Sequence, residues 1–337
     1  MYIKGVYRDG LLAVHQNKQY NQRMKLIQQS FHIEKLHTGD RLDHALQQLL
    51  PEYSRSRIQQ WIQQGFVQLN QQVCKPRQKV YSGDQVDLDV PEQAVISDQP
   101  QEIEFDILHE DEDIFVINKP AGLVVHPAAG HWDGTLVNGL LARDPRLQQL
   151  PRAGIVHRLD KDTTGVMVVA RNLCAHNWLV EQLQARLVKR EYIAIVRGVV
   201  TAGRSIETEM GRHPQNRKKM AVVKEGKNAI THFQVARKFA HHSLISVQLE
   251  TGRTHQIRVH MAHLQYPLLG DSVYSGRAHL PAGVDASLTT IIQEFRRQAL
   301  HAQRLSFEHP GSHETVSYEA PAPADFAALL EALIRYD

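Results

Sequence analysis

The sequence predicts an α+β fold in which a small α/β module precedes a larger domain with a largely antiparallel mixed sheet and flanking helices. Residues 39–90 contain two helical patterns followed by strand-like alternation, as expected for a compact unit. Residues 91–104 are rich in Pro, Gln and acids without an apolar period, so they predict a linker. In residues 105–337, strand-like runs outnumber helical ones without regular alternation. This pattern disfavours a doubly wound parallel sheet.

The small module is expected to start with two short helices. The first follows Asp40, carries leucines at helical spacing and ends at Pro51. The second can be capped by Ser54 and closes at Gly65, a residue suited to the left-handed backbone conformation. Alternation of apolar and polar residues then predicts two strands, at residues 66–69 and 86–90.

Basic side chains concentrate in this module. Arg41, Arg55 and Arg57 fall in the first turns of the expected helices, and Lys75 lies in a later loop. Such a cluster can bind RNA phosphates, although charge counts alone favour an ordinary solvated face. A second basic segment, Arg212–Lys219, allows the same two interpretations. The net charge of +3 neither requires nor excludes a nucleic-acid partner.

The N-terminal segment, residues 1–38, is basic and rich in Gln and Asn, and it predicts a mostly flexible arm. Its longest early apolar run, Leu11–Val14, is far shorter than the apolar region of a secretion signal, and no segment approaches membrane-spanning length. We therefore expect a cytoplasmic protein without a membrane partner. Residues 1–23 carry no recognisable motif, and a native start at Met24 is a hypothesis that N-terminal sequencing of the native protein would test.

The sequence predicts no metal site. The 20 histidines include His255, His260 and His263, but these lack an H-E-x-x-H or equivalent ligand set. The two cysteines, Cys74 and Cys174, have no paired spacing. Neither a disulfide framework nor a cysteine-rich zinc site is therefore expected.

The larger domain contains one strongly charged loop between two apolar runs. Residues 157–165 read HRLDKDTTG and separate residues 154–156 from residues 166–170. From chemistry alone, the loop fits a surface hairpin, a calcium loop or a catalytic loop. A calcium loop requires a bidentate Glu where this chain has Arg171, and a cation at that position argues against it.

The same loop resembles the signature of the pseudouridine synthases that modify ribosomal and transfer RNA, through His157-Arg158-Leu159-Asp160 and Thr163-Thr164-Gly165. Thr164 stands where that family often has Ser, which keeps the hydroxyl group. The resemblance is closest to the subgroup that acts on large-subunit ribosomal RNA, and it covers the chain from about Asp40 to the C terminus. Three further family motifs are matched in the same order: residues 118–127 (NKPAGLVVHP), 190–192 (REY) and 251–260 (TGRTHQIRVH).

The small module resembles the S4 RNA-binding domain, a family that binds structured RNA through its paired helices. The matching segments are residues 39–43 (GDRLD), 54–57 (SRSR), 65–70 (GFVQLN) and 83–86 (GDQV). The resemblance therefore makes four basic residues the expected RNA contacts: Arg41, Arg55, Arg57 and Lys75.

The resemblance to pseudouridine synthases implies roles for four residues of the larger domain. Asp160 is expected to be the essential carboxylate, and Arg258 to pair with it in the closed site. Tyr192 is expected to pack against the target uracil, and Arg158 to touch the displaced RNA backbone or base. By residue type alone, Tyr192 fits the core of its strand, and Arg258 fits the surface of a helix capped by Thr254.

Pseudouridine formation breaks the bond between uracil N1 and the ribose, turns the base and rejoins it through C5. No group is lost, so neither a nucleotide nor any other cofactor is expected. Because C1′ and C5 are out of reach inside a paired helix, the target uridine must be flipped out. The implied partner is 23S ribosomal RNA or a pre-ribosomal particle, bound by a monomer. Attack of Asp160 on the sugar, its attack on the base and elimination to a glycal are the open chemical routes.

Two functions of other classes compete with this interpretation. A non-catalytic RNA chaperone would need only the S4-like module, and it would leave Asp160 on an open surface far from Arg258. A glycosidase cleaves the same kind of bond but needs two carboxylates, and Asp162 is the obvious second candidate.

Overall fold

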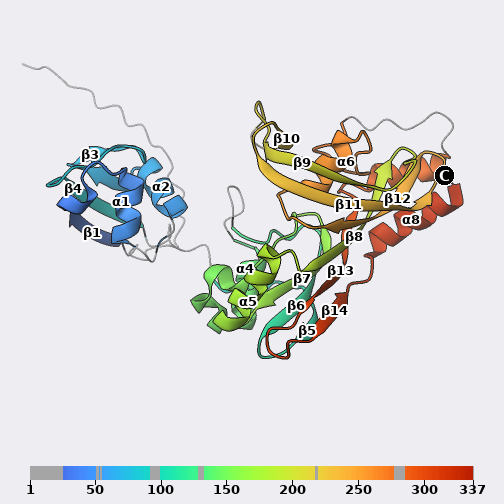
Figure 1. Ribbon diagram of the computed structural model, residues 1–337, viewed down its shortest axis with the longest axis horizontal. Helices are drawn as coiled ribbons and strands as arrows, with labels where there is room; N and C mark the ends of the chain where they lie inside the picture. Colours follow the sequence, from blue (N-terminus) through green and yellow to red (C-terminus); the bar gives the residue numbers. More distant parts are fainter. Residues whose placement is uncertain are drawn as a thin grey trace, which may run out of the picture. The chain divides into compact units, whose positions relative to one another are not determined.

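The computed structural model describes residues 26–50, 53, 55–91, 99–127, 133–216, 219–276 and 285–336. The chain forms two compact units that divide at residue 96 (Figure 1). The expectations for residues 1–25, for the cap at Ser54, for linker residues 92–98 and for Arg217-Lys218 lie outside the described residues. None of the described helices is long and apolar enough to cross a membrane.

The N-terminal unit packs two short helices against a small antiparallel sheet with the strand order β1-β4-β2-β3. Leu42 and Leu46 of the first helix meet Ile58 and Trp61 of the second in a fully buried core. Both helices and both expected strands are therefore present. The elements are β1 (Leu26–His32), a 3-10 turn (Lys35–His37), α1 (Leu42–Leu49), α2 (Arg55–Gln63), β2 (Val67–Leu69), β3 (Gln72–Val73) and β4 (Gln85–Pro91).

Strand β1 corrects the expectation of a flexible arm that extends to residue 38. The strand pairs with β4 in antiparallel register over residues 26–32, and the 3-10 turn that follows connects it to α1. As an outer strand, β1 leaves residues 28–30 exposed. Its polar composition is therefore compatible with a sheet edge, although it gave no alternating pattern to detect.

The C-terminal unit is built on one long sheet, in the order β10-β9-β11-β12-β8-β13-β7-β6-β5, with β14 beside β13. Strands β7 and β13 pair in parallel, and the other paired strands among the described residues are antiparallel. The strands are β5 (Asp106–Glu110), β6 (Ile114–Lys119), β7 (Thr164–Ala170), β8 (Lys189–Arg197), β9 (Arg204–Arg212), β10 (Met220–Val222), β11 (Lys227–Lys238), β12 (His242–Leu249), β13 (Leu300–Glu308) and β14 (Thr315–Glu319). The α-helices are α4 (Leu136–Arg143), α5 (Leu173–Gln184), α6 (Gln256–His263), α7 (Ala286–Glu294) and α8 (Ala324–Tyr336).

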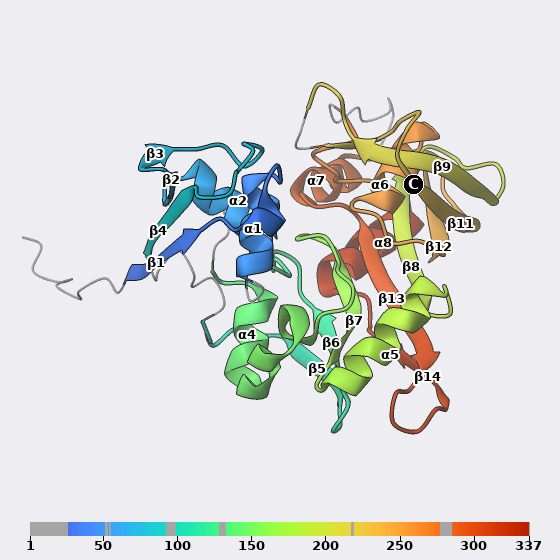
Figure 2. The same cartoon turned by 60° about the vertical axis from the view of Figure 1, so that its left-hand side comes forward.

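The central residues of β8, 192–196, are apolar because they lie between two cores, one on each face of the sheet. Tyr192 and Ala194 on one face join a core with Ile257 of α6. Ile195 on the other face joins a core with Phe326 of α8 and with side chains of α7. Helices α7 and α8 pack together on that side (Figures 1 and 2). Because β8 is central, side chains that project from it are held rigidly.

The expected linker is shorter than its composition indicated. The Gln99 carbonyl accepts a hydrogen bond from the Asn138 side chain at 2.8 Å, and the Gln101 N–H donates to the Asn138 carbonyl at 3.0 Å. Phe105 lies against Gly139, where an added Cβ would come within 2.8 Å of its ring. Residues 99–104 therefore dock on α4 and belong to the C-terminal unit, whereas residue 91 ends β4.

Candidate active site

Asp160 lies in the loop that leads into β7. The Thr163 N–H donates to the Asp160 carbonyl at 3.1 Å, which closes a turn before the strand. Gly165 then has a φ of 116°, and an added Cβ would lie 2.1 Å from the carbonyl oxygen of Ala302 in β13. Glycine therefore lets β7 approach β13 closely, and this approach determines where the loop projects. The Asp160 side chain is 15% exposed.

A buried guanidinium, that of Arg258 in α6, joins two carboxylates. Its Nη1 donates to Asp160 Oδ2 at 3.1 Å, while Nε and Nη2 donate to Asp271 Oδ2 and Oδ1 at 2.7 and 3.0 Å. Burial opposes the charge of Arg258, but hydrogen bonds and attraction from the two carboxylates outweigh burial and raise its pKa. The structure thus brings Asp160 and Arg258 together, and it buries Arg258 instead of leaving it on a helix surface.

Asp271 holds this guanidinium from the loop that follows α6. The Leu269 N–H donates to a carbonyl at the end of β8 at 2.9 Å, and Gly270 turns the chain with a φ of 74°. Asp271 is fully buried, and its Oδ1 also accepts two backbone N–H groups of the next turn, at 2.9 and 3.0 Å. Because Asp271 binds Arg258 through two nitrogens, the remaining Nη1 is directed to Asp160.

His255 faces the other carboxylate oxygen of Asp160. It is the N-cap residue of α6 with a φ of 58° and makes no capping bond, so the expected cap at Thr254 is wrong. Its Nδ1 lies 2.7 Å from the Tyr274 hydroxyl, which accepts the Met220 N–H at 2.9 Å. The hydroxyl has one proton and a second acceptor position for its hydrogen bond with Nδ1, and Nε2 lies 3.9 Å from Asp160 Oδ1. Burial lowers the pKa of His255, which favours the neutral imidazole.

Tyr192 and Arg190 lie two residues apart on β8 and are buried on the same face. Burial raises the pKa of the Tyr192 hydroxyl, and the charges of Arg190 and Asp160 act on it in opposite directions. Tyr192 is therefore within electrostatic range of both groups. This position beside Asp160 suits contact with a base, and the role of Tyr192 against uracil stays a prediction.

A second buried cation, Lys119, ties β6 to the Asp160 loop. Its Nζ donates to the carbonyls of Pro120, Leu123 and Lys161, each at 2.8 Å. Three carbonyls match the three N–H bonds of an ammonium group, so this fully buried side chain has complete hydrogen bonding. Because Lys161 follows Asp160 directly, the third bond restrains the Asp160 loop itself.

Three further residues that the sequence indicated, Arg158, Asp162 and Arg171, lie in different surroundings. Arg158 is exposed, as a contact to RNA would require, and that contact stays a prediction. Asp162 is only partly exposed, and its charge favours protonated Lys119. Arg171, which argued against a calcium loop, forms an ion pair with Asp144 at 3.1 Å.

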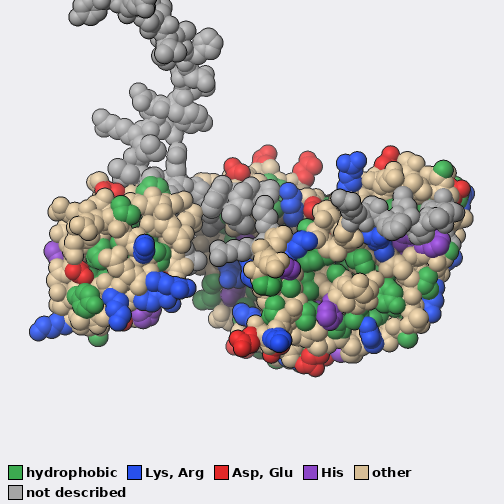
Figure 3. Space-filling model, turned by 90° about the horizontal axis from the view of Figure 1, so that it is seen from above, with side chains coloured by type: hydrophobic (Ala, Val, Ile, Leu, Met, Phe, Trp, Pro, Cys, Tyr) green, Lys and Arg blue, Asp and Glu red, His purple; other side chains and the backbone are tan. Residues whose placement is uncertain are grey.

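Two of the four expected RNA contacts, Arg41 and Arg55, converge on one carboxylate in the N-terminal unit. Asp43 is fully buried and accepts from Arg41 at 3.0 and 2.8 Å and from Arg55 at 3.1 and 3.2 Å. The two arginine side chains are still 39% and 42% exposed, so they remain accessible to phosphate. Lys75 is exposed, and the Arg57 side chain lies outside the described residues. Lys and Arg side chains are visible on both units in Figure 3.

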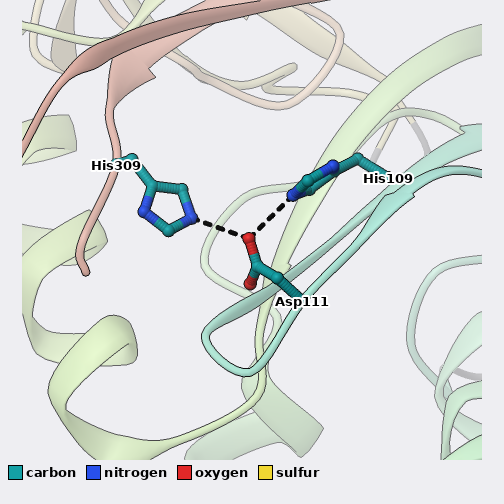
Figure 4. A group of neighbouring side chains, drawn as sticks. All are labelled: His109, Asp111 and His309. Carbon is teal, nitrogen blue, oxygen red and sulfur yellow. Dashed lines mark hydrogen bonds and ion pairs between the residues drawn. The ribbon is translucent and has the colours of Figure 1, made fainter. Parts of the chain in front are cut away.

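Three side chains with metal-ligand chemistry gather elsewhere in the C-terminal unit: His109, Asp111 and His309 (Figure 4). Asp111 Oδ2 lies 2.7 Å from His109 Nε2 and 2.9 Å from His309 Nε2. His309 Nδ1 accepts the N–H groups of Gly311 and Ser312, both at 3.2 Å. The ring proton of His309 is therefore on Nε2 and is donated to Asp111. The group is a hydrogen-bonded connection between two loops, and it offers no free imidazole lone pair at His309.

Comparisons with known proteins agree with this arrangement. The RNA pseudouridylate synthase family model matches residues 113–263, and the S4 domain model matches residues 40–86. Ribosomal large subunit pseudouridine synthase D of Pseudomonas aeruginosa is 53% identical over 299 residues, which cover 89% of this chain and 93% of that protein. The chain belongs to the RNA pseudouridylate synthase family.

Further relatives support the assignment to the pseudouridylate synthases. The Haemophilus ducreyi protein of the same name is 50% identical and covers 88% of this chain and 91% of its own length. Human RNA pseudouridylate synthase domain containing 4 matches with a TM-score of 0.53 and 27% identity, over 69% of this chain and 94% of that one. The predicted α+β fold, the S4 module and the pseudouridine synthase class are thereby confirmed.

Three residues of this pseudouridylate synthase site were not assigned a role from the sequence. Lys119 and His255 lie inside the quoted family motifs, but the sequence alone does not show which groups their side chains contact. Asp271 lies outside those motifs, after the apolar pair Leu268-Leu269 and a glycine. The available signal was a Gly-Asp step after an apolar run, which marks a turn and does not identify a carboxylate that binds a distant arginine.

Asp271→Asn is expected to lower turnover by about 10²-fold with little change in RNA affinity. Asparagine keeps the size of the side chain but loses the charge that fixes two nitrogens of Arg258, and misplacement of a catalytic group by about 1 Å has an effect of this size. Single-turnover rates and RNA titrations would separate the two quantities. Asp285→Asn is the control, because among the described residues this exposed carboxylate accepts only a local N–H at the start of α7. Equal losses in the two variants would contradict a positioning role for Asp271.

The lowered pKa of Lys119 predicts that stability and turnover change in opposite directions with pH. Burial lowers the pKa of Lys119 from 10.5 to about 7, and attraction from Asp162 and Asp160 restores it only in part. Between those values the folded state binds fewer protons than the unfolded state, so the free energy of unfolding should rise with pH. A neutral amine has two N–H bonds for three carbonyls. The Asp160 loop should therefore loosen, and turnover should fall as pH rises through about 7.

Thermal unfolding and single-turnover rates, measured from about pH 6 to about pH 10, would check both trends. Lys119→Met should remove the rise in stability, whereas replacing the exposed Lys238 by Met should not. Parallel trends for stability and turnover in the parent protein would refute the assignment to Lys119.

Asp43→Asn should lower the free energy of unfolding of the N-terminal unit by about 1–3 kcal/mol, because charged hydrogen bonds from Arg41 and Arg55 are weakened. Burial opposes ionisation of Asp43, but hydrogen bonds from Arg55, Gln59 and Arg41 outweigh it and lower the pKa to about 2. The stabilisation is therefore present above about pH 4 and is lost as pH falls toward 2. Hydrogen exchange of α1 and α2 amides would measure it, with exposed Asp89→Asn as the control. Unchanged protection in Asp43→Asn would exclude this role.

Proposed function

We propose that this pseudouridylate synthase isomerises specific uridines of 23S ribosomal RNA, with Asp160 as the essential carboxylate. The observation that supports the proposal best is the ion pair of Asp160 with buried Arg258, which Asp271 orients. The relatives whose names specify the large ribosomal subunit cover nearly the whole length of the chain. The S4 module supplies a second surface for structured RNA.

Within this proposal the two oxygens of Asp160 have different tasks. Oδ2 accepts the Arg258 hydrogen bond, whereas Oδ1 has no hydrogen bond among the described residues and faces His255 at 3.9 Å. Oδ1 is therefore the oxygen available to the substrate. The N1–C1′ bond of the uridine breaks, C5 bonds to C1′, the hydrogen on C5 leaves as a proton, and N1 gains a proton. Atoms balance without any co-reactant.

The target uridine must leave its stack to reach Asp160, because the carboxylate is largely buried. Flipping a base costs a few kcal/mol, and contacts to the base and to phosphates offset that cost. Tyr192 supplies an aromatic ring for the base, and exposed Arg158 supplies a cation beside the vacated position. In the N-terminal unit, Arg41, Arg55, Arg57 and Lys75 would bind phosphates.

The proposal also covers the oligomeric state, the RNA partner and the location of the enzyme. It acts as a monomer on ribosomal RNA or a pre-ribosomal particle in the cytoplasm, without a nucleotide cofactor or metal. The chemistry supports this, since an isomerisation needs no donor or acceptor of electrons or groups. Two RNA-binding units in one chain also provide an extended surface without a second copy.

Asp160→Asn should abolish tritium release from unmodified 23S ribosomal RNA labelled at uridine C5, with RNA affinity nearly unchanged, because charge is lost without a change of size. The comparison variant is Asp162→Asn, which makes the same chemical change two residues further along the loop and should lower turnover only in part, through weaker protonation of Lys119. Tritium release by Asp160→Asn would exclude Asp160 as the essential carboxylate. Equal loss in both variants would favour chemistry that uses two carboxylates.

A further inference from the structure

A pocket of about 410 Å³ opens beside the active site, between the β9–β11 strands and the loop before α6. This size falls in the range of about 300–1,000 Å³ that is typical of sites for small ligands. Met210 and Met220 supply apolar walls, while Lys227, Gly252 and Arg253 supply a polar side. The pocket therefore combines surfaces suited to a base and to an anion.

One chain of contacts connects the wall of the pocket with Asp160. The Met220 N–H donates to the Tyr274 hydroxyl at 2.9 Å, and that hydroxyl lies 2.7 Å from Nδ1 of His255. His255 Nε2 is 3.9 Å from Asp160 Oδ1. Two side chains, Tyr274 and His255, therefore lie between the pocket wall at Met220 and the carboxylate of Asp160.

Behind Gly252 lies a cation whose hydrogen bonding is incomplete. Arg190 is 7% exposed, and its Nη2 donates to the carbonyls of Leu249 and Glu250 at 3.5 and 2.8 Å. Its Nε has no hydrogen-bond partner, and no carboxylate among the described residues forms an ion pair with it. A Cβ added to Gly252 would lie 2.6 Å from Arg190 Nη1, so this nitrogen is directed to the pocket wall.

Two more cations reinforce the positive charge of this wall. Arg253 is exposed, and its Nε donates to the Asn228 carbonyl at 2.9 Å, which holds the side chain along β11. Burial lowers the pKa of Arg190, Tyr192 opposes the shift, and the nearby charge of Arg253 adds to it. Lys227 is exposed, and none of the described carboxylates forms an ion pair with it. One carboxylate is close: Glu209 accepts the N–H of pocket residue Gly226 at 2.8 Å, but among the described residues it forms no ion pair with these three cations. Their uncompensated charge favours binding of an anionic group.

We propose that this pocket is a subsite for the nucleotide next to the target uridine in the RNA chain. Its phosphodiester binds against Lys227, Arg253 and the wall in front of Arg190, and its base packs against the partly buried Met220. The inference rests on the proposed function and names a further RNA contact of the same site. A phosphodiester supplies the missing anion without placing an isolated charge in the core.

Ethylation interference with unmodified 23S ribosomal RNA tests the subsite directly. Ethylation removes the charge of single phosphates, and the RNA is then divided into protein-bound and free fractions. With the parent protein, ethylation of a phosphate next to the modified uridine should exclude RNA from the bound fraction. With Lys227→Gln and with Arg253→Gln, that exclusion should weaken several-fold, because the phosphate contact is already lost. Each variant should also reduce the salt slope of binding by about 0.7–0.9.

The matched control is Lys238→Gln. Lys238 lies on the same strand as Lys227, eleven residues away, which is about 36 Å at strand spacing. This variant should keep the parent interference pattern and the parent salt slope. Undiminished interference at the flanking phosphate in Lys227→Gln and Arg253→Gln would overturn the subsite.

Gly252→Ala tests the contribution of Arg190 without removing its charge. The added Cβ would displace the end of a flexible side chain, Arg190 Nη1, so the fold should tolerate the change. RNA affinity should fall several-fold, and unchanged affinity would remove Arg190 from the subsite. Tritium release by the parent reports the proposed function separately. Release with unaltered interference in the variants would reject only the subsite, whereas no release would reject the proposed function itself.

Discussion

The sharing of one guanidinium between two carboxylates determines the geometry around Asp160. Asp271 takes two nitrogens of Arg258 and two backbone N–H groups, so it fixes the arginine before any substrate arrives. Removing one partner of such a buried group leaves an uncompensated charge, which typically costs about 3–5 kcal/mol. Asp271 neutralises Arg258, and Asp160 therefore keeps a negative charge that is oriented but not fully compensated. A reactive carboxylate needs this combination of fixed direction and available charge.

Placement of Asp160 depends equally on the backbone of its loop. Lys119 binds the Lys161 carbonyl from β6, and Gly165 allows β7 to lie against β13. These contacts come from two strands that flank the loop, so the carboxylate is carried by the rigid sheet instead of by a mobile segment. The cation of Lys119 is used for its hydrogen bonds, since its three carbonyl partners leave no N–H for a ligand.

Sequence reasoning succeeded where a pattern is local and failed where a contact depends on tertiary packing. The two helices and strands 66–69 and 86–90 follow from local periodicity. The family motifs made Asp160 the expected carboxylate, and that role stays a prediction. The contact of Asp271 with Arg258 requires the loop after α6 to pair with the end of β8, which no periodicity encodes. The exposed polar residues of β1 could not indicate a strand, because an outer strand needs no apolar face there.

The arginine side chains fall into two groups, according to whether carboxylates or backbone carbonyls accept their hydrogen bonds. Arg41 and Arg55 share buried Asp43, and Arg258 has Asp271 and Asp160, so carboxylates set the direction of these side chains. Arg190 lies in the same unit as Arg258 and is nearly as buried, yet among the described residues it donates only to carbonyls and its Nε has no partner. The other two buried arginines of the described residues, Arg258 and Arg297, are both paired with carboxylates. The missing partner is therefore better explained by an anion that arrives with the RNA.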